Sequence, residues 1–231
     1  MIRPIVESQQ GLTLVGGAPV PRRDLTLALR RAPGIVAVDG GADAVLRAGL
    51  RPRAVIGDFD SISPAARAAL DPATLHPLAE QETTDFDKAL RSVAAPFVLG
   101  VGFQGARIDH GLAVLNGLVR HRDRACLILG PADVMFHAPP RLTLRLRPGD
   151  RLSLFPLAPV TGQSRGLVWP IDGLRLAPDG MIGTSNRVEA AKVELSVDGP
   201  GLLVILPRAR LDAALRALVP GWRAPPAARG G

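Results

Sequence analysis

The sequence predicts an α/β fold in which an N-terminal doubly wound, mostly parallel sheet is followed by a C-terminal antiparallel β-sandwich. Two observations lead to this prediction. Up to about residue 137, short apolar runs that end in Gly or Asp alternate with segments of helical spacing. After Pro139 and Pro140 the pattern becomes an alternation of apolar and polar residues. We therefore expect an α/β domain over 1–138, a β-sandwich domain over 141–220 and a tail over 221–231, because 231 residues can bury two modest cores.

Five apolar runs of strand length are expected to build the parallel sheet. They cover residues 12–15, 35–38, 54–56, 96–99 and 125–129. Gly or Asp follows each run directly. In open α/β sheets, ligands bind beyond the carboxyl ends of the strands. The functional site is therefore expected along the edge where these Gly and Asp residues collect.

The second half has the pattern of a small antiparallel sandwich or barrel. Apolar and polar residues alternate over 142–147 and 193–197. Turn sequences at 148–150, 178–180 and 198–199 separate such stretches. A short helix is expected over 211–218, and the Pro-, Ala- and Gly-rich tail from Pro225 is expected to fray.

Composition and charge limit the classes of protein and partner. Hydrophobic residues make up 47% and charged residues 21% of the chain, as in folded globular proteins. There is no apolar run of membrane-spanning length and no N-terminal secretory signal, so we expect a cytoplasmic protein without a membrane partner. The net charge is +7, but the basic residues are spread along the chain and there is no Tyr for base stacking. We therefore expect no nucleic acid partner, and Cys126 is expected to be a buried core residue.

Two carboxylates directly after a strand are the most informative feature. Asp58 and Asp60 stand two residues apart after Gly57, so their side chains point the same way if the extended backbone continues. Paired carboxylates repel each other unless a cation or a proton neutralises them. At a phosphate site they favour Mg²⁺, which usually takes one or two carboxylates together with waters and phosphate oxygens. Taken alone, this stretch can also be a solvated Asp-rich turn.

A second polar segment precedes a predicted helix whose apolar positions extend to Ala94. Within residues 81–85, either Thr84 or Asp85 can cap that helix. Capping uses one of the two residues. The other one and Gln81 are then available to a ligand.

A third polar segment, residues 105–110, precedes a helix with apolar positions at helical spacing over 112–119. Arg107 suits bidentate contact with a phosphate, and a helix N-terminus favours anions. Asp109 stands at the start of the helix. The alternatives are an ordinary surface pair of Asp109 with Arg107 and, for His110, a hydrogen-bonded polar residue without a catalytic role.

Four of these segments, taken in order, resemble the thiamine pyrophosphokinase family. They are Asp39-Gly40-Gly41-Ala42-Asp43, Gly57-Asp58-Phe59-Asp60-Ser61, Thr84-Asp85 and Arg107-Ile108-Asp109-His110, at separations similar to those of the family. Residues 153–157, 166–169 and 183–186 resemble the thiamine-binding domain of that family. The resemblance covers nearly the whole chain, and an ordered set of segments is far more specific than any one of them.

The resemblance implies a fold, a reaction and an assembly. Members have an N-terminal α/β catalytic domain, which binds ATP, and a C-terminal β-sandwich domain. They work as homodimers with thiamine bound near the subunit interface. In the implied Mg²⁺-dependent reaction, the hydroxyl of thiamine attacks the β-phosphorus of ATP, which gives thiamine diphosphate and AMP.

The resemblance also implies which residues form the site. The expected catalytic residues are Asp58, Asp60, Asp85 and Asp109, and Asp58, Asp60 and Asp85 are expected to hold Mg²⁺. The expected substrate- and ATP-binding residues are Asp39, Gly40, Gly41, Ser61, Gln81, Thr84, Arg107, His110, Ser185 and Asn186. Four acids exceed what one Mg²⁺ takes, so at least one acid is expected to orient the alcohol, accept its proton or face the thiazolium ring. Trp169 is interpreted as a core or interface aromatic rather than a residue that stacks on a ring.

The chain departs from the family's pattern at three places. Gln81-Glu82 stand where many bacterial members have Lys-Asp, Ala106 replaces a usual Gly, and Val114 replaces a common Asn. One alternative function is a pyrophosphokinase acting on a hydroxymethyl pterin, against which the second domain argues. The other is a noncatalytic nucleotide or nucleic-acid binder on the same fold. Concentrated acids argue against that binder, because they repel a polyanion unless a metal is present.

Overall fold

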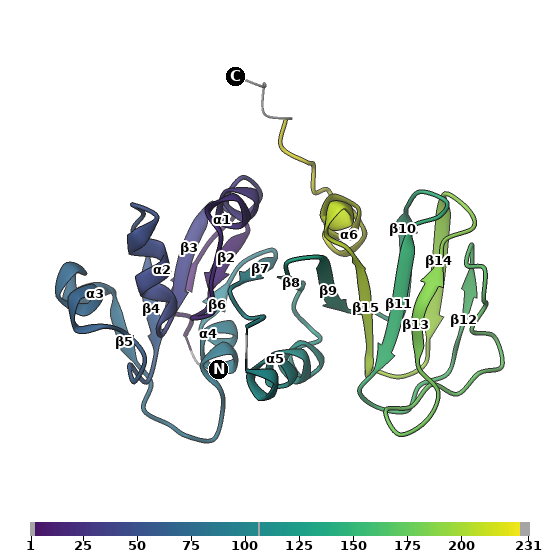
Figure 1. The fold of residues 1–231 in the computed structure, drawn as a ribbon, viewed down its shortest axis with the longest axis horizontal. Coiled ribbons are helices and arrows are strands. Elements are labelled where there is room, and N and C mark those ends of the chain that lie inside the picture. The colour runs from purple at the N-terminus through teal and green to yellow at the C-terminus, as the bar shows by residue number, and fades with distance from the viewer. Residues whose placement is uncertain (1–2, 106, 227–231) are drawn as a thin grey trace.

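A computed structural model describes residues 3–105 and 107–226 and shows two halves that share one sheet (Figure 1). The strands of this sheet are β2 (Leu12–Val15), β3 (Gly34–Val38), β4 (Ala54–Gly57), β5 (Leu75–Pro77), β7 (Val98–Val101), β8 (Cys126–Leu129), β9 (Asp133–His137), β11 (Arg151–Pro156), β13 (Gly183–Arg187) and β15 (Leu202–Pro207). They lie in the order β13-β11-β15-β9-β8-β7-β2-β3-β4-β5. The six strands from β8 to β5 are parallel, and the remaining pairings are antiparallel. The mixed α/β class predicted from the sequence is confirmed.

Helices cover both faces of the parallel part of the sheet (Figure 1). Helices α1 (Arg22–Leu29) and α2 (Gly41–Arg47) contribute to one core, and α4 (Asp85–Arg91) and α5 (Ile108–Arg120) contribute to the other. Every residue of β2, β3, β4, β7 and β8 is therefore buried, which explains why these strands read as continuous apolar runs. Helix α3 (Pro64–Ala69) and the 3₁₀ turn η1 (Pro72–Thr74) connect β4 to β5 at the outer edge.

The order of the parallel strands defines where a ligand can enter. From β2 the chain adds β3, β4 and β5 on one side, and then returns to add β7 and β8 on the other side of β2. The direction of strand addition therefore reverses between β2 and β7. Crevices at such a switch point, beyond the carboxyl ends of the strands, are the usual ligand sites of open α/β sheets.

The C-terminal half is a sandwich whose two sheets have different relations to the rest of the fold. One sheet has three antiparallel strands, β10 (Arg141–Arg145), β14 (Lys192–Val197) and β12 (Gly162–Arg165), in that order. The other consists of β15, β11 and β13, and it continues the large sheet because β15 pairs with β9. The sequence predicted a sandwich that follows the α/β sheet, but it did not predict this continuity. Pairing with β15 covers the edge that β9 would otherwise expose.

Ion pairs join the end of the chain to the first helix. The 3₁₀ turn η2 (Arg208–Arg210) leads into α6 (Leu211–Leu218), which has the bounds predicted from the sequence. Asp212 accepts from Nε of Arg31 at 2.5 Å, and Asp24 accepts from Arg208 at 2.8 Å. Both pairs connect α1 and the residues after it to the C-terminal segment. The expected tail over 221–231 is described only as far as residue 226.

Some local predictions need correction. The strand expected over 96–99 is β7 at Val98–Val101, so it begins beyond Pro96, which cannot donate to a ladder. Helix α4 ends at Arg91, because Val93 and Ala94 form the short strand β6 (Val93–Ala94), which pairs with β1 (Val6–Glu7).

The buried face of α5 also differs from the predicted one. Val114, Gly117 and Leu118 are buried, whereas Leu112 is exposed and Leu115 and Val119 are half-buried. The departure at Ala106 lies outside the described residues. Cys126 is buried as predicted, and burial raises the pKa of its thiol to about 12. None of the helices within 3–105 and 107–226 is long and apolar enough to cross a membrane.

Candidate active site

Three carboxylates converge beyond the ends of two neighbouring parallel strands. Asp39 follows β3, and Asp58 and Asp60 follow β4. Each residue offers one carboxylate oxygen, and these oxygens all lie within 4.8 Å of one another. Because β3 and β4 pair in parallel register, Val38 with Ile56, the residues that follow them meet at one edge. We call Asp39, Asp58 and Asp60 the acidic cluster.

The backbone of the acidic cluster adopts conformations that bulky residues rarely take. Asp39 has a φ of 45° and Phe59 has a φ of 68°, both in the left-handed region. Gly57 allows the two segments to approach, because a Cβ there would lie 2.8 Å from the Cβ of Asp39. The prediction that Asp58 and Asp60 point the same way assumed that the extended backbone continues beyond β4. The turn at Phe59 interrupts this extended backbone. The two carboxylates converge through this turn.

Asp39 is the most perturbed acid of the cluster. It is only 6% exposed, and its Oδ1 is buried with no hydrogen-bond partner among the described residues. Its Oδ2 accepts from the backbone N–H of Ser61 at 3.2 Å. Burial raises the pKa of Asp39 to about 6 despite hydrogen bonds from Ser61 and Gly40 that lower it. A buried carboxylate oxygen without a partner is destabilised, and a cation among these acids would satisfy it.

Hydrogen bonds within the loop after β4 hold Asp60 and Asp58. The hydroxyl of Ser61 donates to Oδ1 of Asp60 at 2.7 Å, and this hydrogen bond lowers the pKa of Asp60. The backbone N–H of Asp60 donates to Oδ1 of Asp58 at 3.4 Å. Ser61, which the sequence predicted as a binding residue, therefore orients Asp60 through its side chain and Asp39 through its backbone.

Lys88 is a site residue that the sequence reasoning missed. Its Nζ lies 3.0 Å from Oδ1 of Asp85 and 3.3 Å from Oδ2 of Asp58. Burial lowers the pKa of Lys88, but the hydrogen bonds and charges of Asp85 and Asp58 outweigh burial and raise it. The spacing of Asp85 and Lys88, one helical turn apart, was the available signal. The same contact shows that Asp85, predicted to bind metal, faces an ammonium group in this structure.

Thr84 caps α4, which was one of the two roles considered for it. Its Oγ1 accepts from the N–H of Asp87 at 3.3 Å and donates to Oδ2 of Asp87 at 3.0 Å. Asp87 is buried and also lies 2.9 Å from Nε2 of His121 at the end of α5. Asp85 is therefore not the N-cap of α4. Gln81 is exposed on the loop before the helix.

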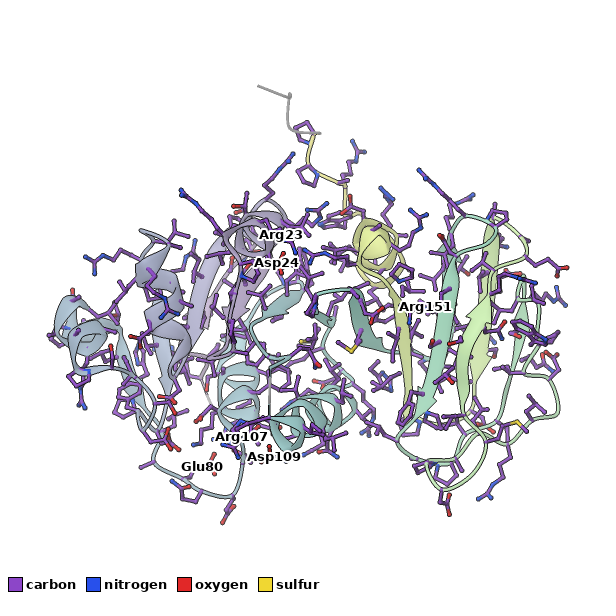
Figure 2. The ribbon with its side chains drawn as sticks, in the orientation of Figure 1. Arg23, Asp24, Glu80, Arg107, Asp109 and Arg151 are labelled. Atoms are coloured by element: carbon purple, nitrogen blue, oxygen red, sulfur yellow. The ribbon has the colours of Figure 1, made fainter. Side chains whose placement is uncertain are left out.

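The third predicted segment lies at the same edge but outside the acidic cluster. Arg107, Asp109 and His110 are all exposed, and the guanidinium of Arg107 donates to Oδ2 of Asp109 at 2.6 Å. Figure 2 shows this pair beside the start of α5, on the same side of the molecule as Glu80. The contact is the surface pair that was the alternative interpretation of these two residues. It leaves Asp109 on the rim and not among the converging carboxylates.

Glycines bring the ends of β2 and β3 together near the cluster. A Cβ at Gly41 would lie 1.8 Å from the carbonyl oxygen of Val15, so only glycine fits there. A Cβ at Gly40 would lie 3.1 Å from the carbonyl oxygen of Ser61. The predicted pair Gly40-Gly41 therefore packs between the end of β2 and the loop that carries Asp60.

The two residues predicted in the second half lie on β13 and differ in their roles. The amide of Asn186 is buried, donating to the carbonyl of Trp169 at 2.6 Å and accepting from its N–H at 3.3 Å. Ser185 has an exposed side chain and a φ of 60°, and its N–H donates to Oγ of Ser153. Trp169 is 56% exposed, so it is not a core residue. The guanidinium of Arg187 lies over its ring, 5.6 Å from the centroid.

The fold and this site define a two-domain α/β protein with an acidic cluster beyond the carboxyl ends of its parallel strands. Comparisons with known proteins identify the family. The family model "Thiamin pyrophosphokinase, catalytic domain" matches residues 25–129, and the model "Thiamin pyrophosphokinase, vitamin B1 binding domain" matches residues 141–202. Together the two models match most of the chain. The chain belongs to the thiamin pyrophosphokinase family, a family of enzymes.

Individual relatives agree with this membership. The chain is 24% identical over 197 residues to "Thiamine pyrophosphokinase 1" of Oryza sativa subsp. japonica, which covers 71% of this chain and 75% of that protein. It is 26% identical over 178 residues to the protein of the same name from Arabidopsis thaliana, covering 67% of this chain and 65% of that protein.

Solved structures show the same fold. A thiamin pyrophosphokinase from Candida albicans matches with a TM-score of 0.73 and 16% identity, covering 90% of this chain and 95% of that chain. One from Bacillus subtilis matches with a TM-score of 0.69 and 21% identity, covering 86% and 98%.

Proposed function

We propose that this protein transfers a pyrophosphoryl group from ATP to the hydroxyl of thiamine in a Mg²⁺-dependent reaction. The observation that carries the proposal is the acidic cluster, in particular the buried Oδ1 of Asp39, which has no partner among the described residues. A divalent cation held by Asp39, Asp58 and Asp60 would satisfy this oxygen.

The residues fit Mg²⁺ because all three donors are carboxylate oxygens, the ligands this ion prefers. Asp58 and Asp60 would hold the ion, with Asp39 as a third carboxylate within reach. Asp85 remains a predicted ligand, since only its Oδ1 is engaged by Lys88 at 3.0 Å. When bound, the ion would neutralise the negative charge that develops on the transferred group.

The chain's own residues would position the reactants. The hydroxyl oxygen of thiamine forms a bond to the β-phosphorus of ATP, and the bond from that phosphorus to the oxygen bridging to the α-phosphorus breaks. AMP leaves with that oxygen, and the proton of the hydroxyl passes to a carboxylate at this edge, with Asp85 and Asp109 as the candidates. Arg107, which is exposed on the rim, would grip phosphate by exchanging its contact with Asp109 for a phosphate oxygen.

Thiamine would be held by the second domain, through β13 and the segment before it. Ser185 offers an exposed hydroxyl, and Trp169 offers an exposed ring. Asn186 would act indirectly, because its amide holds the backbone of Trp169. The match of residues 141–202 to a vitamin B1 binding domain supports thiamine over a pterin as the acceptor.

A homodimer is part of the proposal. Large apolar side chains are exposed at the start of α5, where Ile108 is 77% exposed and Leu112 is also exposed. A second exposed group consists of Trp169, Met181 and Ile182. Exposed apolar side chains of this size favour a protein interface. Light scattering coupled to size-exclusion chromatography should give twice the mass of the 24.3 kDa chain, and the monomer mass would contradict a dimer.

The reaction is tested with purified protein, ATP, Mg²⁺ and thiamine, following AMP and thiamine diphosphate by chromatography. The expected result is equal amounts of both products, lost when the metal is chelated and absent when a hydroxymethyl pterin replaces thiamine. Release of ADP in place of AMP, or no reaction at any divalent ion concentration, would contradict the proposal. Pyrophosphorylation of the pterin alone would point to the alternative acceptor.

A further inference from the structure

Lys88 is a buried cation in an acidic surrounding. The residue is only 1% exposed and is among the largest of the fully buried side chains. It lies in the last turn of α4, and its buried neighbours Phe86, Ala89 and Leu90 pack in the core on one face of the parallel sheet. A buried ammonium is costly unless it is paired, and Lys88 is paired twice, with Asp58 and with Asp85.

The choice of lysine at this position contrasts with the rest of the chain. Of the 28 basic residues, only Lys88 and Lys192 are lysines, and the others are arginines. Lysine carries a compact point charge, whereas arginine carries a wide planar fork that needs more space. The compact ammonium of a lysine therefore fits a buried position between two carboxylates better than a guanidinium does.

The ion pairs of Lys88 divide four acids of this edge into two groups. The four acids are Asp39, Asp58, Asp60 and Asp85. The oxygens of Asp39, Asp58 and Asp60 converge with no ammonium or guanidinium on Asp39 or Asp60 among the described ion pairs. On the other side, Oδ2 of Asp58 and Oδ1 of Asp85 both face Lys88. Asp58 belongs to both groups, so Lys88 fixes one of its oxygens while the other accepts from the N–H of Asp60.

We propose that Lys88 is a positioning residue that occupies, as a fixed monovalent counter-ion, the place between Asp58 and Asp85 where a second divalent cation would otherwise bind. The inference rests on the proposed function only in taking the acidic cluster as a divalent cation site. Two carboxylates within hydrogen-bond distance of one ammonium can also reach a shared divalent ion. With the ammonium in place, the protein alone accepts one divalent ion per chain.

Removal of the ammonium should change cation binding in a defined direction. Lys88→Met keeps an unbranched side chain that is one atom shorter and removes its charge, which leaves one more net negative charge beside the cluster. Coulomb attraction for a divalent ion therefore increases, although Asp58 and Asp85 lose an orienting partner. A residue that only filled space in the core would change the stability of the fold and leave the number of bound ions unchanged.

The experiment counts Mn²⁺ bound to the protein without nucleotide, by electron paramagnetic resonance of the free ion during a titration. We expect one Mn²⁺ per chain in the wild type. In Lys88→Met we expect a second Mn²⁺ per chain, or a first one bound at least about tenfold more tightly. Lys192→Met is the matched control, because that lysine is exposed on β14 and pairs with Glu194, and its binding isotherm should equal that of the wild type.

A second substitution separates the carboxylates. In the double variant Asp85→Asn with Lys88→Met, one of the two acids is gone, so the additional Mn²⁺ should disappear. Should Lys88→Met fail to fold, as judged by circular dichroism, Lys88→Gln takes its place, since its amide can still donate to one carboxylate without a charge. An isotherm of Lys88→Met or Lys88→Gln that superimposes on the wild type, or weaker binding, would overturn the proposal.

The outcome is distinguishable from failure of the proposed function. If the wild type makes no thiamine diphosphate but Lys88→Met binds an additional Mn²⁺, the role of Lys88 stands and the reaction falls. If the wild type makes product and the Mn²⁺ counts are equal, the reaction stands and the role of Lys88 falls.

Discussion

The acid-lined edge of the parallel sheet and the β13 region of the second domain are built from opposite chemistry. At the sheet edge, carboxylates are brought together by backbone at positive φ, and Asp39, the buried one of the three, has an oxygen without a hydrogen-bond partner among the described residues. Around β13, the functional candidates are neutral, and the amide of Asn186 is fully engaged with the backbone of Trp169. Charge concentrated before ligand binding suits a polyphosphate with its metal, whereas neutral hydrogen bonds and an exposed ring suit an organic cation.

The largest expected effect breaks the charged side of this comparison. Asp60→Asn removes one charge from the acidic cluster with little change in volume, so we expect product formation to fall by about a thousandfold without loss of fold. Steady-state kinetics at several Mg²⁺ concentrations and a thermal melt measure the two quantities. The control Asp179→Asn lies in an exposed turn of the second domain and should behave like the wild type. Full activity of Asp60→Asn would refute its role in metal binding.

A smaller effect is expected on the neutral side. Ser185→Ala removes an exposed hydroxyl, and a neutral hydrogen bond contributes about 1 kcal/mol, so the KM for thiamine should rise about fivefold. The KM for ATP should not change, since ATP is expected at the other region. Ser196→Ala, which also removes an exposed hydroxyl from a strand of the second domain, is the matched control. Equal changes in both KM values would show that the two regions are not separate in function.

A third prediction concerns a charge that supports structure only. Asp150 accepts two hydrogen bonds from Arg210, at 2.5 and 2.8 Å, and these hold the pKa of Asp150 below its ordinary value of 3.8. Because the folded pKa is lowered, the pair stabilises the fold above about pH 4, and this contribution is lost as the pH falls further. Asp150→Asn should therefore lower the free energy of unfolding by about 2 kcal/mol at pH 7.

Urea unfolding of Asp150→Asn and of the wild type at pH 7 and near pH 3 measures this difference. The difference should shrink at the lower pH, and kcat should remain that of the wild type. A difference that is constant with pH would show that the loss comes from packing and not from the charged pair.

The sequence predicted where the strands lie along the chain better than it predicted which strands pair with each other. The apolar runs before Gly16, Asp39, Gly57 and Gly130 are strands, because burial on both faces produces a continuous apolar pattern. The continuity of the sheet from β9 to β15 was not predictable, since it depends on pairing between residues about 70 positions apart.

The candidate site was predictable to a similar degree. Asp58 and Asp60 were found because they adjoin in sequence, but the convergence of Asp39 with them depends on the pairing of β3 with β4. Lys88 escaped notice because a single lysine in a helix usually indicates a solvated face. Asp109 matched a motif, yet its position on the rim beside Arg107 is set by the loop after β7.

The smallest expected effect tests whether metal binding depends on the direction in which each carboxylate points or only on how many carboxylates lie at this edge. Asp43 is also an acid at this edge, on the first turn of α2, but both its oxygens accept from Ser63, at 2.5 Å from Oγ and 3.1 Å from the N–H. Those hydrogen bonds outweigh burial and lower the pKa of Asp43, in contrast to the raised pKa of Asp39. Asp43→Asn should cost about 1 kcal/mol of stability and leave kcat within about twofold of the wild type.

Kinetics and urea unfolding of Asp43→Asn should be measured beside Asp39→Asn, which removes an acid only four residues away. Asp39→Asn should increase the Mg²⁺ concentration required for half-maximal activity, because it removes the charge of the carboxylate whose Oδ1 has no partner within residues 3–105 and 107–226. If Asp43→Asn shifted the Mg²⁺ requirement as strongly as Asp39→Asn, the total negative charge of the edge would determine metal binding. If only Asp39→Asn shifts it, the direction in which each carboxylate points is decisive, and the left-handed backbone at Asp39 is the feature that sets that direction.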